Sequence, residues 1–340
     1  MTSNPALETL MLAFEGEDSL KLPHRALFLG AEPHPKLQQW PDLLGWQPLK
    51  SLANAWEAAG FRRADKIGDE KWPMVLILPG KSKDETLGWF AMAKNHLKPG
   101  GRILVAMPNA AGAGRFEKEL SLAAGGISSI QKNKARAFHA TLDHADEAIF
   151  ARWSRLNEST TIHGTHYLTR AGIFSSQHID PGSALLAAHF PAHLRGEIAD
   201  LGAGWGYLSD KLLARCPGIT RLDLYEADAR AVECSQVNLT EYAARPEGLI
   251  RFFWHDVTQG IPEQYDAIIM NPPFHSGQQT NVDLGRAFLR EAGNSLKRGG
   301  KLLLVANRQL PYEAVLESGG YSWRKIVEDK IYKVIFAEKR

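Results

Sequence analysis

Ile198-Ala-Asp-Leu-Gly-Ala-Gly-Trp-Gly206 is the stretch that decides the fold of this 340-residue chain. Its apolar start predicts a buried strand, its glycines predict a tight turn, and residues 207–215 read as the helix that follows. Glycines at such a turn let the backbone approach a ligand closely, and the N–H groups at the start of the helix point at that ligand. This order is typical of an α/β domain with a parallel sheet, which binds its ligands at the carboxyl ends of the strands.

An acidic residue closes the next strand. Residues 221–225 read as a strand that ends at Glu226, about 20 residues after Gly206. An acid at this spacing typically accepts hydrogen bonds from ribose hydroxyls. A solvated acid at a strand end is the structural alternative.

A third strand carries another acid. Residues 249–254 read as this strand, and Asp256 follows it after one intervening residue. We expect Asp256 to accept the amine of an adenine ring and Val257 to donate its backbone N–H to a ring nitrogen. With Asp200 and Glu226, the acids form one line along the carboxyl edge of the sheet.

Asp266-Ala-Ile-Ile-Met-Asn-Pro-Pro-Phe-His275 predicts the reactive corner. Residues 267–270 read as a buried parallel strand that ends at Asn271. Each proline pushes the residue before it toward extended geometry, so the Asn271 amide oxygen and the Pro272 carbonyl are expected to point off the sheet edge. Two adjacent acceptors suit both N–H bonds of a planar amine, and Phe274 supplies a stacking face for the ring that carries it. Alone, this corner is also compatible with an ordinary Asn-Pro turn.

The two halves of the chain repeat the same order of elements. The matching segments are 26–31 with 198–203, 74–78 with 267–270, 98–106 with 297–306, and 135–142 with 330–336. Agreement of several elements in one order predicts two copies of an α/β domain and not a solenoid. We expect a first domain at residues 1–142, a linker or helix at residues 143–158, and a second domain at residues 159–340.

The two copies differ where chemistry is expected. Phe28 stands where the second copy has Asp200, and Glu32 stands where it has Gly204. The second copy also inserts a polar loop, residues 275–281, directly after its proline corner. The first copy is therefore expected to be catalytically empty.

Composition sets the class of protein. Hydrophobic residues make up 44% of the chain and charged residues 23%, which fits folded domains with real cores. The formal net charge of +2 is too small to indicate a nucleic-acid binder, so any basic surface must be local. The two cysteines form no zinc spacing or disulfide framework. With no signal-peptide pattern and no long apolar run, we expect a soluble protein of the reduced cytosol.

The second half resembles class I S-adenosylmethionine-dependent methyltransferases, and the duplicated layout resembles their ribosomal RNA guanine-N2 branch of the small-subunit RsmC type. Residues 271–275 carry the resemblance most specifically. Supporting segments are Gln279-Thr280 with Asp283, 305–307 with 310–312, and 172–175 with 180–183 upstream of the glycine turn. Trp205 departs from the smaller residue usual in this family, which we expect to narrow the cofactor mouth without abolishing binding.

The resemblance implies two tandem Rossmann-like domains, with a mostly parallel seven-stranded sheet in the second. It implies transfer of a methyl group from S-adenosylmethionine to the N2 amine of a guanine in 16S ribosomal RNA of the small subunit. The expected cofactor-binding residues are Phe174, Asp200, Gly202, Ala203, Gly204, Gly206, Glu226, Ala227, Asp256, Val257 and Asn271. The expected catalytic residues are Asn271, Pro272, Pro273 and Phe274, and the expected substrate-binding residues are Phe274 and His275.

Ribosomal RNA must be held by local basic groups, and the sequence offers three clusters. They are Arg62, Arg63 and Lys66; Lys132, Lys134 and Arg136; and Arg152 with Arg155. Because most lie in the first copy, we hypothesise that this copy is an RNA-docking and stabilising platform. His163 and His166 are three residues apart but have no third ligand, so no metal is expected. The chain is expected to act as a cytoplasmic monomer, away from membranes.

Other activities fit parts of the pattern. A guanine of large-subunit RNA, adenine N6 and a glutamine amide also present planar amines to an Asn-Pro-Pro-aromatic corner. An NAD-dependent dehydrogenase would use the glycine turn and Glu226, but it leaves the proline corner unexplained. A non-catalytic RNA-binding protein would suit the first half alone.

Overall fold

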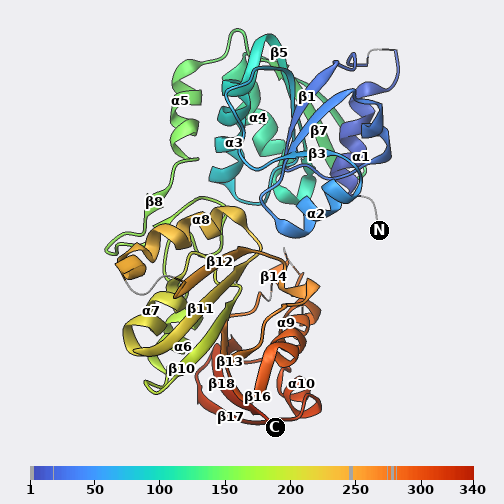
Figure 1. Ribbon diagram of the computed structural model, residues 1–340. Coiled ribbons are helices and arrows are strands. Elements are labelled where there is room, and N and C mark those ends of the chain that lie inside the picture. Colours follow the sequence, from blue (N-terminus) through green and yellow to red (C-terminus); the bar gives the residue numbers. More distant parts are fainter. Residues whose placement is uncertain (1–3, 18, 245–247, 274, 277–278, 281) are drawn as a thin grey trace. The chain divides into compact units, whose positions relative to one another are not determined.

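The computed structural model describes residues 4–17, 19–244, 248–273, 275–276, 279–280 and 282–340. The chain divides into two compact units, Met1–Glu158 and Ser159–Arg340 (Figure 1). Each unit is a seven-stranded sheet covered by helices.

The first unit has strand order β3-β2-β1-β4-β5-β7-β6. Its strands are β1 (Arg25–Leu29), β2 (Asp42–Trp46), β3 (Arg62–Ala64), β4 (Trp72–Ile77), β5 (Leu97–Pro108), β6 (Ser128–Lys132) and β7 (Ala135–Thr141). Its α-helices are α1 (Pro5–Met11), α2 (Lys50–Ala58), α3 (Lys83–His96), α4 (Ala113–Ala124) and α5 (Glu147–Arg155).

The second unit has strand order β12-β11-β10-β13-β16-β18-β17. These strands are β10 (Arg195–Leu201), β11 (Gly218–Glu226), β12 (Ile250–Trp254), β13 (Tyr265–Met270), β16 (Leu296–Asn307), β17 (Tyr321–Glu328) and β18 (Tyr332–Lys339). Its α-helices are α6 (Pro181–Ala188), α7 (Tyr207–Arg215), α8 (Ala229–Asn238), α9 (Val282–Ser295) and α10 (Glu313–Ser318). Two short hairpins are β8 (Thr160–Thr161) with β9 (Leu168–Thr169), and β14 (His275–Ser276) with β15 (Gln279–Thr280).

The two large sheets have the same topology. In each, the first five strands in spatial order are parallel, the sixth (β7 or β18) is antiparallel to both of its neighbours, and the last (β6 or β17) again runs parallel to the first five. The strands of the four segments matched between the halves occupy corresponding places, β1 with β10, β4 with β13, β5 with β16 and β7 with β18. The predicted fold class, two tandem Rossmann-like α/β domains, is confirmed.

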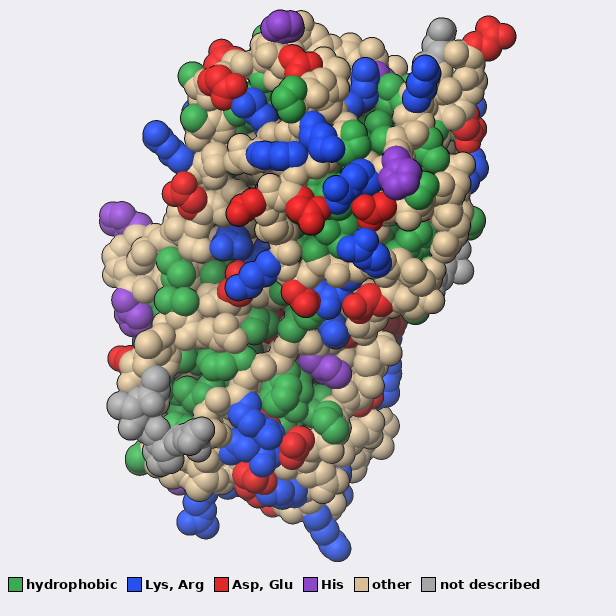
Figure 2. Space-filling model, turned by 45° about the horizontal axis from the view of Figure 1, so that its top comes forward, with side chains coloured by type: hydrophobic (Ala, Val, Ile, Leu, Met, Phe, Trp, Pro, Cys, Tyr) green, Lys and Arg blue, Asp and Glu red, His purple; other side chains and the backbone are tan. Residues whose placement is uncertain are grey.

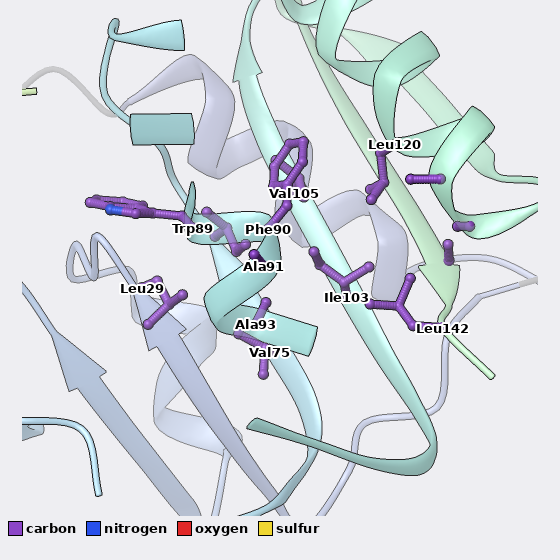
Figure 3. Packing of buried hydrophobic residues seen from close by; sticks show 14 of the residues in the cluster. Leu29, Val75, Trp89, Phe90, Ala91, Ala93, Ile103, Val105, Leu120 and Leu142 are labelled. Carbon is purple, nitrogen blue, oxygen red and sulfur yellow. The ribbon is translucent and has the colours of Figure 1, made fainter. Parts of the chain in front are cut away.

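The first unit has a core on each face of its sheet, one against α3, α4 and α5 and the other against α1 and α2. Figure 3 shows Leu29, Val75 and Ile103 from neighbouring strands packed with Phe90 of α3. These four side chains are fully buried. Runs of apolar residues on both faces of a strand are typical of parallel sheets covered on both sides, which explains why these strands read as continuous apolar segments.

The second unit has a core on each face of its sheet. Ile198 and Ile269 pack with α6 and α7 on one face, whereas Ala199 and Ile268 pack with α9 and α10 on the other. Successive residues of a strand point to opposite faces, so each strand contributes to both layers. The sheet is thereby held rigidly in a three-layer sandwich, and its carboxyl edge is fixed.

The segment expected as a linker or helix, residues 143–158, is largely helical. Helix α5 begins after Asp146, whose side chain accepts from the N–H groups of Ala148 and Ile149. Phe150 and Trp153 are buried in the core of the first unit. The amphipathic spacing of these two aromatic residues thus anchors α5 to this unit, and the boundary between the units falls at residues 158 and 159.

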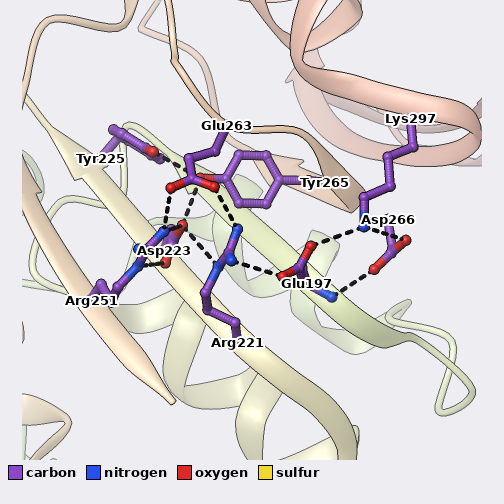
Figure 4. A network of polar contacts seen from close by, with 9 residues as sticks. All are labelled: Glu197, Arg221, Asp223, Tyr225, Arg251, Glu263, Tyr265, Asp266 and Lys297. Atoms are coloured by element: carbon purple, nitrogen blue, oxygen red, sulfur yellow. Dashed lines mark hydrogen bonds and ion pairs between the residues drawn. The ribbon is translucent and has the colours of Figure 1, made fainter. Parts of the chain in front are cut away.

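A polar network ties together the amino ends of the central strands of the second unit, at the end of the sheet opposite the glycine turn. Figure 4 shows Asp223, which is fully buried, bonded to Arg251 (2.8 Å to Oδ1) and to the Tyr265 hydroxyl (2.6 Å). Glu263 joins Arg221 and Arg251 at 3.1 and 3.2 Å. Because buried charges are stable only when paired, this network is a structural support and not a second reaction centre. No helix in the described residues is long and apolar enough to cross a membrane.

Candidate active site

The glycine turn after β10 forms the floor of the site. Gly202, Gly204 and Gly206 have φ values of +73°, +56° and +92°, a region that other residues enter at a cost. The N–H groups of Gly202 and Ala203 donate to the carbonyl of Tyr225 at 2.8 and 3.1 Å, which fixes the turn against β11. A Cβ built at Gly204 meets nothing within 4 Å, so the backbone there faces open space in which a ligand can approach it.

Asp200 lies beneath this turn and is fully buried. Its Oδ2 accepts from the Ser209 hydroxyl at 2.8 Å, whereas Oδ1 has no hydrogen-bond partner in the part of the chain that the structure describes. Burial raises the pKa of Asp200 to about 7. A buried acceptor without a donor is unfavourable, which agrees with the raised pKa of this carboxyl.

Glu226 closes the neighbouring strand and braces the turn. Its Oε2 accepts from the N–H of Gly204 and its Oε1 from the N–H of Asp228, both at 2.8 Å. Burial raises the pKa of Glu226 to about 6, and the backbone donors oppose that rise. Each carboxylate oxygen can accept more than one hydrogen bond, so Glu226 retains acceptor capacity for ligand hydroxyls.

Asp256 and Val257 continue this edge beyond β12. Asp256 Oδ1 accepts from the N–H and the hydroxyl of Thr258 at 3.0 and 2.7 Å, and Val257 is buried. The N–H of His255 donates to the Glu226 carbonyl at 2.8 Å. The ends of β11 and β12 are therefore joined, and the predicted ribose and adenine contacts lie on consecutive strands.

Asn271 follows β13 and its side chain is held at one end. The amide nitrogen Nδ2 donates to Asp180 Oδ2 at 2.9 Å and to the Ser183 hydroxyl at 2.8 Å. Asp180 is the N-cap of α6 and also accepts from the N–H of Ser183 at 2.7 Å. Since a carboxylate only accepts, the nitrogen must face Asp180, and the oxygen Oδ1 points to the other side of the amide.

One cavity joins the glycine turn to Asn271 and to the first turn of α6. Its lining includes Gly202, Ala203 and Gly204 of the turn together with Asn271, and Phe174 lies at its mouth with 57% of its surface exposed. Trp205 also lines it. The Trp205 ring is almost fully buried and packs 4.9 Å from the ring of Tyr167.

Comparison with known proteins places this site in a family. The family model of the methyltransferase small domain matches residues 164–336. The ribosomal RNA small subunit methyltransferase C of Pectobacterium atrosepticum is 32% identical over 290 residues, covering 85% of this chain and 80% of that protein. The chain belongs to this family. The corresponding protein of Psychromonas ingrahamii is 31% identical over 254 residues, covering 73% and 71% of the two chains.

Among solved structures, the T. thermophilus 16S rRNA N2 methyltransferase RsmC, in complex with AdoMet and guanosine, matches with a TM-score of 0.79. The match covers 100% of this chain and 93% of that chain at 23% identity. At this identity the comparison shows a shared fold. Because the match extends over the whole chain, both units of this methyltransferase have counterparts in that structure.

The structure brings many of the predicted site residues of this methyltransferase together, and their roles remain predictions. Phe174, Gly202, Ala203, Gly204 and Asn271 line the common cavity. Asp200 lies below the turn, and Gly206 directly precedes α7. Glu226, Ala227, Asp256 and Val257 follow along the same sheet edge outside the cavity lining, and the Trp254 indole donates to the Ala227 carbonyl at 2.9 Å.

The proline corner is described only in part. Pro272 is buried and Pro273 is half-buried. Phe274 lies outside the described residues. His275 belongs to β14 through its backbone, and its side chain is outside the described part. The predicted stacking and substrate contacts of these two residues therefore stay predictions.

Sequence reasoning missed the contact of Asp180 and Ser183 with Asn271. Residues 180–183 entered the prediction only as a segment upstream of the glycine turn that supports the family resemblance. The available signal was Asp-Pro-x-Ser before an apolar run, which predicts a helix N-terminus, but nothing in the sequence places that N-terminus beside Asn271.

The corresponding turn of the first unit is filled by protein side chains. The N–H groups of Gly30 and Ala31 donate to the Trp46 carbonyl at 2.9 and 3.2 Å, as their counterparts do in the second unit. Glu32, at the position of Gly204, accepts from the Asn4 amide at 3.1 and 3.0 Å. Where Gly204 leaves open space, the first unit thus has a half-buried side chain held by its own N-terminal segment.

Proposed function

We propose that the second unit transfers a methyl group from S-adenosylmethionine to the exocyclic N2 amine of a guanine in 16S ribosomal RNA. The observation that carries the proposal is the orientation of the Asn271 amide, whose nitrogen is held by Asp180 and Ser183 at the edge of the glycine-turn cavity. This orientation presents the oxygen Oδ1 as an acceptor for a planar amine. The names of the relatives, and of the T. thermophilus protein solved with AdoMet and guanosine, support the choice of donor and base.

S-adenosylmethionine supplies a methyl group that is already activated on a positively charged sulfur. The glycine turn admits it to the backbone, Glu226 accepts hydroxyl hydrogen bonds from its ribose, and Asp256 with Val257 reads its adenine. These residues place the methyl group, and placement in line with the amine supplies much of the rate.

The chemistry on the RNA side falls to the proline corner. The lone pair of a guanine amine is shared with the ring, so the amine is a weak nucleophile. Acceptance of both N2 hydrogens by Asn271 Oδ1 and the Pro272 carbonyl localises this lone pair toward the methyl group. As the methyl group moves from sulfur to nitrogen, the carbon–sulfur bond breaks and S-adenosylhomocysteine leaves as the neutral thioether. Positive charge grows on nitrogen and meets these fixed acceptors, the inverse of an oxyanion hole, and one N2 proton then passes to water. Stacking on Phe274 would add about 1–3 kcal/mol of binding.

The first unit serves as a docking platform in this proposal. Lys132 and Lys134 are exposed at the turn between β6 and β7, and Arg152 and Arg155 are exposed on α5. On the face shown in Figure 2, Lys and Arg side chains are interspersed with Asp and Glu. Arg136, predicted in the same cluster, is instead ion-paired with Glu117.

The same intramolecular pairing removes two other predicted contacts. Arg62 pairs with Asp42 at 2.9 Å, and Arg63 pairs with Glu57 at 3.0 Å. Cations that are ion-paired within the chain are weaker phosphate ligands, so we assign docking mainly to Lys132, Lys134, Arg152 and Arg155. We assign the activity to a cytoplasmic monomer that needs no metal.

The direct test is transfer of a labelled methyl group to 16S ribosomal RNA, free and within assembled small subunits, followed by nucleoside mass spectrometry. The expected product is N2-methylguanosine. Formation of N6-methyladenosine, or label in ribosomal protein, would replace guanine with another planar amine. Absence of transfer to either form of the RNA would contradict the proposal.

A further inference from the structure

The first turn of α6 has a function beyond starting the helix. Asp180 Oδ2 accepts two hydrogen bonds, one from the N–H of Ser183 within the helix and one from Asn271 Nδ2 across from β13. The Ser183 hydroxyl accepts the second Asn271 N–H at 2.8 Å. Both amide hydrogens of Asn271 are therefore bound by the first turn of the helix. Asp180 is half-buried and Ser183 is buried.

The amide group of an asparagine has no strong orientation of its own. Its terminal torsion is broad and roughly two-fold, so the nitrogen and the oxygen exchange places at little cost unless neighbours distinguish them. The two ends act oppositely toward a substrate amine, because Oδ1 accepts and Nδ2 only donates. If the Asn271 amide were turned by half a rotation, the N–H donors of Nδ2 would face the substrate amine, which is itself a donor.

We propose that Asp180 and Ser183 are positioning residues that lock the Asn271 amide with its oxygen toward the substrate amine. This inference rests on the proposed methyl transfer, because it assigns the supports of the group that contacts the amine. A carboxylate is the strongest discriminator available, since it repels the amide oxygen and attracts the amide nitrogen. Ser183, one helical turn further, engages the second hydrogen and so fixes the plane of the amide.

The packing of α6 fits this role. A Cβ at Gly182 would lie 3.0 Å from Cε1 of Tyr332 on β18. The absence of a side chain at this position lets the first turn of α6 lie close to the sheet edge. Asp180 and Ser183, on either side of Gly182, are thereby brought to the end of β13.

Helix capping alone does not explain the arrangement, because the first unit has a cap without this contact. Asn4 caps α1, which also begins with proline, and accepts from the N–H of Ala6 at 3.0 Å. Its amide donates to Glu32, whose side chain lies at the position of Gly204 in the corresponding turn of the first unit. Both units have the helix cap, and in the second unit the capping residue also binds Asn271 at the end of β13.

The test uses the full chain in single-turnover methyl transfer to 16S ribosomal RNA at saturating S-adenosylmethionine, with cofactor affinity measured by calorimetry. Asp180→Ser keeps a good N-cap but is too short to reach Asn271, and Ser183→Ala removes the second acceptor. Asp180→Asn retains an acceptor oxygen and serves as the rescue variant. Asn4→Ser makes the same cap replacement in the first unit and is the matched control.

We expect Asp180→Ser to slow the single-turnover rate by about tenfold to a hundredfold, the effect of misplacing a reacting group. Ser183→Ala should slow it by about three- to tenfold; because both residues line the cavity beside the glycine turn, the rates are compared at saturating S-adenosylmethionine for each variant. Asp180→Asn should recover most of the rate, and Asn4→Ser should match the wild-type chain. Added to Asn271→Ala, Asp180→Ser should cause no further loss, because the group it orients is gone.

Two results would overturn the inference while leaving the methyl transfer intact. One is an active wild-type chain whose rate is unchanged by Asp180→Ser and Ser183→Ala. The other is a further loss of rate in the double variant as large as in the single one, which would mean that Asp180 acts independently of Asn271. An inactive wild-type chain would instead remove the proposed function itself.

Discussion

The backbone N–H of Gly204 donates to Glu226 Oε2 at 2.8 Å. In the corresponding contact of the first unit, the side chain is the donor and the backbone is the acceptor. There, Gln47 occupies the place of Glu226, and its Nε2 donates to the Ala31 carbonyl at 3.0 Å. In both units the side-chain oxygen Oε1 of this residue, Glu226 or Gln47, accepts from the N–H two residues further along the chain, that of Asp228 or of Leu49. One turn geometry is thus kept by an acid in one unit and by an amide in the other. Only the acid leaves acceptors for a ligand.

Gly204→Ala tests whether the open space at the turn is a cofactor site. Alanine at φ +56° is strained, and its methyl group would project into the space that is now open. Gly299→Ala is the matched control, since Gly299 has φ +74° and no atom within 4 Å but lies at the opposite end of the strands. Both variants should lose about 1 kcal/mol of stability. Only Gly204→Ala should weaken S-adenosylmethionine binding in calorimetry, by tenfold or more, and equal affinities would contradict the assignment.

Asp200→Asn tests the buried carboxyl through pH. Burial raises the pKa of Asp200 to about 7 from an ordinary value of 3.8. The unfolded chain therefore loses this proton at lower pH than the folded one, so ionisation favours unfolding increasingly as pH rises from about 4 to about 7, and the effect levels off above that. Asparagine cannot ionise. The free energy of unfolding of Asp200→Asn, relative to that of the wild-type chain, should grow by about 2 kcal/mol between pH values near 5 and near 8, as measured by urea unfolding. A constant difference between the two proteins would contradict the raised pKa.

Much of the fold was predictable because parallel strands buried on both faces are visible as apolar runs. The strands β1, β4, β5, β11, β12, β13 and β16 fall within one or two residues of the predicted segments or contain them, and β10 begins three residues earlier than predicted. Strands β2, β3, β6 and β17 were missed, and β6 and β17 are largely exposed edge strands. The burial of β2 alternates and β3 has only three residues, with little burial, so both lack a continuous apolar signal. The position of β2 follows from pairing with β1 and that of β3 from pairing with β2, which is a tertiary effect.

The site was predictable where single residues have unusual conformations and not where distant segments meet. The three glycines of the turn announce their positive φ in the sequence. The bond from Asn271 to Asp180 joins residues 91 positions apart, and no local pattern encodes it. The ion pair between Arg136 and Glu117 likewise depends on how α4 packs on β7, so a cation that looked free in the sequence is neutralised in the fold.

Asp223→Asn tests the support at the amino ends of the strands. Asparagine would leave Arg221 and Arg251 without the buried charge that now binds them at 3.3 and 2.5 Å. Breaking a buried pair from one side costs about 3–5 kcal/mol. Glu263→Gln, in the same network but with its side chain 39% exposed, should cost less than about 1 kcal/mol. Urea unfolding checks both values, and equal losses would mean that burial of Asp223 is not what stabilises the network.

Lys132→Glu with Lys134→Glu tests the docking platform. Both lysines are exposed, and replacing two phosphate contacts should weaken RNA binding and lower the slope of log affinity against log salt by roughly one to two units. Lys21→Glu with Lys98→Glu changes the net charge equally at exposed positions of the same unit and outside the three basic clusters. Filter binding across a salt series compares them. If both double variants lose affinity equally, net charge and not this turn governs binding.

Asn271→Ala in single-turnover methyl transfer to 16S ribosomal RNA tests whether the Asn271 amide oxygen accepts from the guanine amine in the transition state. Alanine removes the amide oxygen but leaves the glycine turn, Glu226 and Asp256 in place. We expect nearly normal S-adenosylmethionine affinity by calorimetry. The single-turnover rate should fall by about a hundredfold or more, the usual effect of removing one group that stabilises transition-state charge. A variant that binds the cofactor and still methylates guanine at close to the wild-type rate would contradict this role of the amide oxygen.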